Sequence, residues 1–145
     1  MSEKMGWDST KRSRRMFKEK MINDKPNGLN LMLPWPDSIL NPNRKDHWAK
    51  KHRPKVAARE AGYYIALDRG VKLDAGKKYV VELVFCPPDK RKRDLDNLVS
   101  SMKSALDGMC RGLGIDDEMI RPLPDWGPVV KGGKVEVTIT EKIDA

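Results

Sequence analysis

The chain has 145 residues, of which 34% are charged, and its formal net charge is +8 with a pI of about 9.5. This length suits one domain with its own core, and this charge indicates an anionic partner, either nucleic acid or an acidic membrane surface. No apolar run approaches the roughly 18 residues of a membrane span. The basic N-terminus has no apolar stretch behind it, so we expect a cytoplasmic protein without a secretory signal.

Cysteine and histidine are too sparse to suggest a metal site. Cys86 and Cys110 have no CxxC spacing, so we expect buried thiols in a reducing compartment and no zinc site. His47 and His52 are too few and too poorly spaced for a histidine site, and we expect them on the surface of a basic loop.

The N-terminal part of the chain differs from the rest. Residues 1–28 carry eight Lys or Arg against four Asp or Glu. Few apolar residues there offset the entropy of ordering, so a mobile basic arm is predicted, followed by one domain over residues 29–145. Leucines occupy every second position of residues 29–33, which predicts a strand that is ended by the prolines after it.

The middle of the chain alternates between helix and strand signals. A cation-rich loop is predicted for residues 37–53, and a helix over residues 54–70 with a proline in its first turn. Residues 79–86 predict a strand that is apolar on both faces and therefore interior. A second helix is predicted from Leu95 to Met109, where apolar residues recur at three- and four-residue steps until a glycine-rich stretch ends it.

The C-terminal third predicts two further strands. Residues 120–130 contain three prolines, which indicates a broken or edge strand. "KGGK" at 131–134 is typical of a hairpin, and strict alternation predicts a last strand over residues 134–141. The order of elements is strand, helix, strand, helix, broken strand, strand. It predicts an α/β (α+β) fold, a two-layer sandwich of two main helices on a mixed sheet of about four strands.

Two carboxylates, Asp94 and Asp96, follow the densest positive run of the chain in "PPDKRKRDLDNL". They stand where a buried strand ends and a helix starts, so both can point the same way in the extended turn. An aspartate before a helix is also a common N-cap, which explains one of them but not the second. The pattern fits either a stabilising ion-pair cluster or a site that grips a polyanion and holds a metal against it.

A polar stripe continues along the second helix from Asp96 through Lys103 to Asp107. Lys103 is seven residues after Asp96 and shares its side of the helix, although a solvated helix face would look the same. Asp117 belongs to a third acidic cluster, "DDE", which also fits a turn or a cap. If its loop folds back onto the helix start, Asp117 joins Asp94 and Asp96. Mg²⁺ would then relieve their repulsion through oxygen ligation.

Cations and tryptophans are further candidates for a surface that binds nucleic acid. Trp48 lies inside a basic cluster, where it either stacks on an unpaired base or packs on the helix. Trp35, between two prolines, is expected at the edge of the core. Lysine and arginine contacts to phosphate supply most of the sequence-independent affinity for DNA. Two groups of cations are candidates for such contacts: Lys90, Arg91, Lys92 and Arg93, and then Arg44, Lys45, Lys50, Lys51 and Arg53.

Five motifs, in order, resemble the RusA-type Holliday-junction resolvases over roughly residues 29–141: "LPWP", "PPDKRKRDLDNL", "SALDG", "GIDDEMI" and "KGGKVEVTITE". The resemblance implies a homodimeric, Mg²⁺-dependent endonuclease of bacterial or phage origin, with Mn²⁺ as a substitute metal. It also implies that Asp94, Asp96 and Asp117 are the catalytic metal ligands and that Arg93 contacts DNA.

The sequence departs from the pattern of this family at several places, one of which bears on catalysis. The family typically has a functional lysine at the place held here by Ser100, and we hypothesise that Lys103, one turn further on, takes its catalytic role. The expected function is resolution of four-way DNA junctions in recombination or repair by paired phosphodiester hydrolysis. The partner is then branched DNA, with no membrane and no small-molecule cofactor. The alternatives are a broader nuclease for branched or flapped DNA and a catalytically impaired junction-binding protein.

Overall fold

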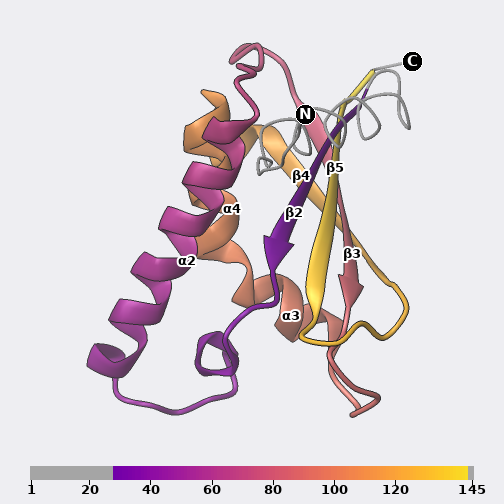
Figure 1. Cartoon of the computed structure of the whole chain (residues 1–145). Coiled ribbons are helices and arrows are strands. Elements are labelled where there is room, and N and C mark those ends of the chain that lie inside the picture. Colours follow the sequence, from indigo (N-terminus) through magenta and orange to yellow (C-terminus); the bar gives the residue numbers. More distant parts are fainter. Residues whose placement is uncertain (1–27, 144–145) are drawn as a thin grey trace, which may run out of the picture.

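The computed structural model describes residues 28–143, so the predicted arm lies, apart from Gly28, outside the described residues. Figure 1 shows the helices α2 and α4 side by side along one side of a twisted sheet. The elements, in chain order, are β2 (Gly28–Pro34), the 3₁₀ helix η1 (Ser38–Leu40), α2 (Trp48–Asp68), β3 (Tyr79–Cys86), α3 (Leu95–Ser101), α4 (Lys103–Leu113), the 3₁₀ helix η2 (Asp117–Met119), β4 (Ile120–Trp126) and β5 (Lys134–Glu141).

The strands form one mixed sheet in the order β2-β5-β3-β4, with β3 and β4 parallel and the other pairs antiparallel. The predicted α+β fold, with helices on a mixed four-stranded sheet, is confirmed. In β2, β3 and β5, every second residue is apolar and buried. The face of the sheet that these residues form packs with Met102, Met109 and Leu113 into one core. Trp35 closes the core edge as predicted, with its ring edge-to-face against Phe85 at 6.0 Å between centroids.

β4 is an edge strand, as its prolines predicted. Pro122 and Pro124 stand opposite Val81 and Leu83 of β3. Residues two apart in a strand direct their N–H groups to the same side. The donors that the two prolines lack are therefore missing only from the outer side of β4, which faces away from β3. The alternate residues keep their N–H groups for pairing with β3.

The hairpin predicted for "KGGK" is wrong. A tight turn does form there, since the N–H of Gly133 donates to the carbonyl of Val130 at 2.8 Å and Gly132 and Gly133 have φ of 82° and 71°. The flanking strands β4 and β5 do not pair, however, because β5 lies between β2 and β3. The turn residues fix the local bend, and the wider topology decides which strands become neighbours.

The first helix starts earlier than predicted. α2 begins at Trp48, where Nδ1 of His47 accepts a hydrogen bond from the N–H of Ala49 at 3.2 Å, and Pro54 lies inside the helix. A proline in a helix forgoes one backbone hydrogen bond, and α2 continues through it. The last six residues of the predicted basic loop are therefore helical, so Lys50, Lys51 and Arg53 are presented by a rigid element.

The second predicted helix is two helices, and of the three glycines expected to end it only Gly114 does so, while Gly108 and Gly112 lie inside α4. The break falls at Met102, and α4 continues past Gly108 to end at Leu113, where Gly114 takes a left-handed φ of 79°. At Gly108, an added Cβ would lie 1.9 Å from the carbonyl oxygen of Arg59 in α2. The glycine therefore allows the two helix backbones to touch, which a sequence pattern cannot distinguish from a terminator.

Both cysteines are buried free thiols, as predicted. Burial, together with the nearby carboxylates, raises the pKa of Cys110 to about 12, and burial also raises the pKa of Cys86. Such thiols stay protonated and unreactive at neutral pH. Among residues 28–143, no helix combines the length and the apolar character needed to cross a membrane.

Candidate active site

The turn between β3 and α3 is braced by Arg93. Its guanidinium lies 2.8 Å from a carboxylate oxygen of Asp89, donates to the backbone carbonyls of Asp89 and Arg91 at 3.2 and 3.0 Å, and stacks 5.4 Å from the ring centroid of Trp35. Its side chain is only 13% exposed. A backbone hydrogen bond from Arg91, and then the Arg93 guanidinium, hold the pKa of Asp89 below its usual range.

The other three cations of this run are exposed on the same turn. Lys90, Arg91 and Lys92 all face solvent, and Arg91 approaches Asp89 only at 3.9 Å. The run therefore divides into one arginine that shapes the turn and three cations that are free to meet an anion. We call residues 89–93 the basic turn.

Asp94 and Asp96 open α3 directly after the basic turn. One carboxylate oxygen of Asp94 accepts hydrogen bonds from the N–H groups of Asp96 at 2.9 Å and Asn97 at 3.4 Å, so Asp94 is the N-cap. This satisfies orphan donors of the helix, and its second oxygen is available to a ligand. Asp94 also lines a cavity of about 480 Å³ together with Arg91, Lys92 and Arg93, while Asp96 is exposed in the first turn.

Asp117 meets a partner that sequence reasoning did not select. Its carboxyl group lies close to that of Asp107, and Nζ of Lys103 lies 3.6 Å from Asp117 and 3.8 Å from Asp107. Burial raises the pKa of Asp107, whereas hydrogen bonds with Asp116 and Asp107 lower the pKa of Asp117. The signal for Asp107 was its place four residues after Lys103, on one side of a helix.

Asp117 does not join Asp94 and Asp96 within one chain. Because η2 packs against α4, Asp117 lies beside Lys103 and Asp107 instead of at the start of α3. The cavity of about 470 Å³ that Asp117 lines shares no residue with the cavity at Asp94. Across residues 28–143, no three His, Cys, Asp or Glu side chains are grouped so that they could hold a metal ion.

Lys103 faces Asp117 and Asp107, and not the start of α3 as the polar stripe suggested. The break at Met102 interrupts the helix between Asp96 and Lys103, so the regular seven-residue repeat no longer applies. Lys103 is 73% exposed, and Ser100 lines the same cavity of about 360 Å³. Position 100, where a functional lysine was expected, and position 103, which carries a lysine, therefore border the same cavity.

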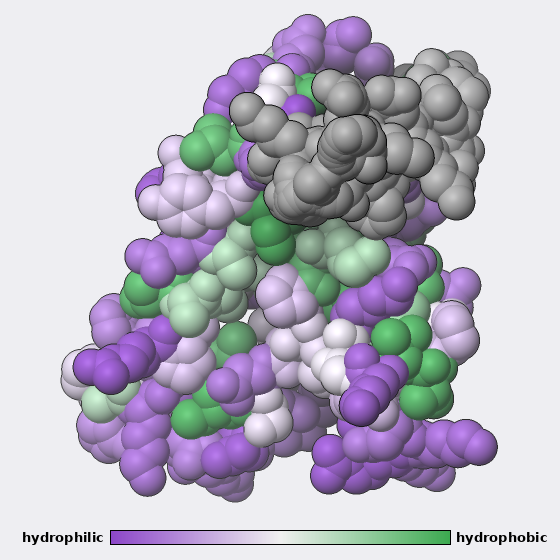
Figure 2. Space-filling model, viewed as in Figure 1, coloured by the Kyte–Doolittle hydropathy of each residue, from purple (hydrophilic) through white to green (hydrophobic). Residues whose placement is uncertain are grey.

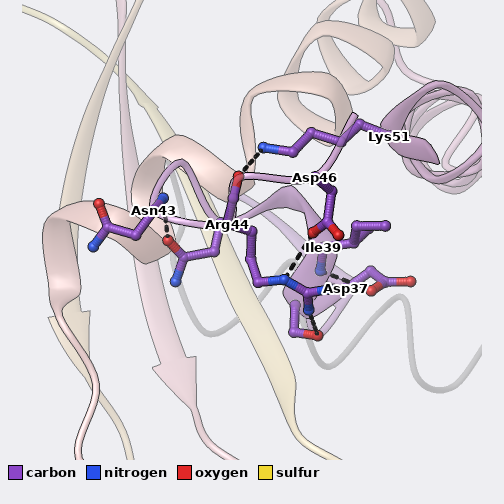
Figure 3. A network of polar contacts seen from close by, with 8 residues as sticks. Asp37, Ile39, Asn43, Arg44, Asp46 and Lys51 are labelled. Carbon is purple, nitrogen blue, oxygen red and sulfur yellow. Dashed lines mark hydrogen bonds and ion pairs between the residues drawn. The ribbon is translucent and has the colours of Figure 1, made fainter. Parts of the chain in front are cut away.

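The basic segment before α2 is organised by its own hydrogen bonds (Figure 3). Nε of Arg44 donates to Asp46 at 2.8 Å, and Nζ of Lys51 donates to the carbonyl of Arg44 at 2.8 Å. Lys45, Lys50 and Arg53 are exposed. Trp48 is 74% exposed, with its ring 5.6 Å from that of His47, so of its two predicted roles packing on the helix is not observed.

Both basic segments lie at one end of the molecule. In Figure 1 the segment leading into α2 and the turn between β3 and α3 both project at the lower end. Figure 2 shows hydrophilic side chains gathered along this same end. The carboxylates at the start of α3 thus lie between two cationic projections.

Several curated proteins align with this chain. Crossover junction endodeoxyribonuclease RusA of Escherichia coli O139:H28 is 36% identical over 125 residues, which cover 79% of this chain and 96% of that protein. RusA of Escherichia coli K12 is 35% identical over the same shares. An uncharacterized protein of Xylella fastidiosa is 33% identical over 116 residues, 76% of this chain and 74% of its own. No family model matches.

These alignments identify the class of protein, which is that of the endodeoxyribonucleases. Within this class, the chain belongs to the RusA family of crossover junction endodeoxyribonucleases, as its motifs predicted. A thiamine-monophosphate kinase from Stenotrophomonas maltophilia K279a aligns at a TM-score of 0.32 with 12% identity over 82% of this chain and 32% of its own, and this likeness supports no inference.

Proposed function

We propose that this protein is a divalent-metal-dependent endonuclease that resolves four-way DNA junctions by paired phosphodiester hydrolysis. The observation that carries the proposal is that 35–36% identity to RusA extends over 96% of that protein's length. The geometry supports it, since two carboxylates open α3 directly behind three exposed cations. A C2 dimer would present two equivalent sites to the two-fold symmetric junction, which suits paired nicks.

Asp94, Asp96 and Asp117 are the proposed ligands for Mg²⁺, with Mn²⁺ as a substitute, and because Asp117 lies apart from the other two within one chain, it would reach them only after a rearrangement or from a second protomer. Their donors fit, because Mg²⁺ takes hard oxygens from one or two carboxylates and completes its shell with waters and substrate phosphates. The position of Lys103, 3.6 Å from Asp117 and 3.8 Å from Asp107, also fits, since a cation beside these carboxylates relieves their repulsion. When bound, the metal would neutralise charge at the phosphate and make a water more acidic.

The other residues bind and orient the DNA. Lys90, Arg91 and Lys92 hold phosphates on one side of the carboxylates, and the cations of residues 44–53 hold them on the other. Arg93 fixes the shape of the basic turn, and the part of its guanidinium that remains exposed contacts the DNA. Lys103 stabilises negative charge that develops on the phosphate, from a position beside Asp117.

Replacing Lys103 with alanine tests this last role. We expect the single-turnover cleavage rate at saturating junction to fall by about a hundredfold, because an electrostatic donor at the reacting phosphate is lost. Junction affinity should change little, since Lys103 is one cation among many. Lys78→Ala, which removes an exposed cation remote from the carboxylates, is the matched control and should cleave like the wild type. Unchanged turnover in Lys103→Ala would remove Lys103 from the mechanism.

Incubation with a synthetic four-way junction and Mg²⁺ tests the function itself. We expect symmetric nicks in two opposing strands, detected on denaturing gels with each strand labelled in turn, and no cleavage in EDTA. A junction that is shifted on native gels but stays uncut with Mg²⁺ or Mn²⁺ would indicate a binding protein. Equal cleavage of flaps and junctions would indicate a broader nuclease.

A further inference from the structure

A second basic surface lies between α2 and α4, separate from the basic turn. Lys51, Lys55 and Arg59 follow one another at four-residue steps on α2, so they share one face of that helix. This face borders a cavity of about 360 Å³ whose opposite wall is formed by the end of α3 and the start of α4. We call this space the α2–α4 groove. Its polar lining consists of four cations, the hydroxyls of two serines that are not buried, the buried Ser101 and one carboxylate: Lys51, Lys55, Arg59, Lys103, Ser100, Ser104, Ser101 and Asp107.

Among residues 28–143, Lys103 is the one groove cation that forms ion pairs, with Asp107 and Asp117. Within residues 28–143, the ion pairs involve neither Lys55 nor Arg59. Lys51 donates to a backbone carbonyl and keeps its charge. A concave surface with four cations and one carboxylate carries an excess of positive potential that attracts anions. The two hydroxyls add donors of the kind that bind phosphate oxygens.

Arg59 is held at the inner end of the groove by the packing of the helices. Its carbonyl oxygen would lie 1.9 Å from a Cβ added at Gly108, so the backbone of α2 touches that of α4 next to Asp107. Arg59 and Asp107 line both the groove and the acidic cavity that contains Asp116 and Asp117. The two spaces therefore meet at Arg59.

We propose that the α2–α4 groove binds one DNA strand through its backbone phosphates, with Arg59 contacting the phosphate closest to Asp107 and Asp117. The proposal rests on the proposed function for the identity of the ligand. A guanidinium can bind two phosphate oxygens at once, which suits it to fix the orientation of a phosphate better than the ammonium of Lys55. The groove thus leads a DNA strand from the face of α2 toward the carboxylates of Asp107 and Asp117.

Binding measurements on Arg59→Gln and Lys55→Gln test the groove. The probe is a fluorescent four-way junction with Ca²⁺ in place of Mg²⁺, titrated at several salt concentrations. We expect each variant to bind about tenfold more weakly, with the slope of log affinity against log salt reduced by about 0.9. Lys78→Gln loses the same charge outside the groove and should bind within about twofold of the wild type. Because the Arg59 side chain is exposed, thermal melts should match the wild type.

Cleavage at saturating junction separates Arg59 from a general phosphate contact. With Mg²⁺, we expect the single-turnover rate of Arg59→Gln to fall about a hundredfold and that of Lys78→Gln, which lies outside the groove, to remain near the wild type. Arg59→Lys should recover affinity without recovering the rate. Wild-type affinity in both Arg59→Gln and Lys55→Gln would overturn the proposal that the groove binds DNA, even if the protein cleaves junctions. If the wild type binds but does not cleave, the proposed function fails, and weaker binding by the two variants still supports the groove.

Discussion

Asp94→Asn is expected to lower the single-turnover rate of junction cleavage by about a thousandfold while α3 and junction affinity stay intact. Asparagine caps helices as well as aspartate does, so the hydrogen bonds to the N–H groups of Asp96 and Asn97 persist. The charge that a divalent cation requires is lost, however. A thousandfold corresponds to about 4 kcal/mol of transition-state stabilisation.

A second substitution at the same position separates the two roles of this carboxylate. Asp94→Ala removes both the charge and the cap, so it should share the loss of cleavage and also lose about 1 kcal/mol of unfolding free energy. The matched control is Asp74→Asn, because Asp74 also accepts a backbone hydrogen bond, from Gly76 at 2.8 Å, but lies outside the proposed site. It should cleave and unfold like the wild type.

Cleavage rates, chemical denaturation and anisotropy binding on these three variants decide the assignment. Wild-type cleavage by Asp94→Asn would show that the cap is the whole function of the residue. Loss of junction binding in the same variant would mean that the carboxylate organises the basic turn and holds no metal. Either result would leave Asp96 and Asp117 to be tested in the same way.

The strands and their faces could be predicted because alternation reports burial directly. The leucines of β2 and the two-sided apolar pattern of β3 gave the right strands, and the prolines of β4 gave an edge strand. Strand order could not be predicted, since the pattern within a strand says which face is buried and not which strand lies beside it. The position of β5 between β2 and β3 follows from tertiary packing.

The residue types of the acidic site could be predicted from the sequence, but which of these residues lie together could be predicted only in part. The N-cap alternative for Asp94 was correct, because capping depends on local sequence. The placement of Asp117 beside Asp107 depends on how η2 packs against α4, which involves no local signal. The break at Met102, which the apolar pattern does not indicate, moved Lys103 off the predicted stripe. Short-range chemistry was therefore predictable, and contacts between elements were not.

Gly108→Ala is expected to destabilise the fold by more than about 3 kcal/mol, in spite of the better helix propensity of alanine. Alanine gains about 1 kcal/mol inside a helix. Its Cβ, however, would lie 1.9 Å from the carbonyl oxygen and 2.8 Å from the carbonyl carbon of Arg59, and backbone atoms cannot rotate away as a side chain can. The helices α2 and α4 would have to separate, and this loosens the core that they share.

The reciprocal position and a neutral glycine complete the test. At Gly62, an added Cβ would lie 2.1 Å from the carbonyl oxygen of Ala105, so Gly62→Ala should be similarly destabilised. At Gly76, the nearest atom is a side-chain oxygen of Asp74 at 3.4 Å, and Gly76→Ala should stay within about 0.5 kcal/mol of the wild type. Thermal melts should show this contrast as roughly 10 °C or more between the variants. Wild-type stability in Gly108→Ala would contradict the close approach of α2 to α4, and with it the position of Arg59 beside Asp107.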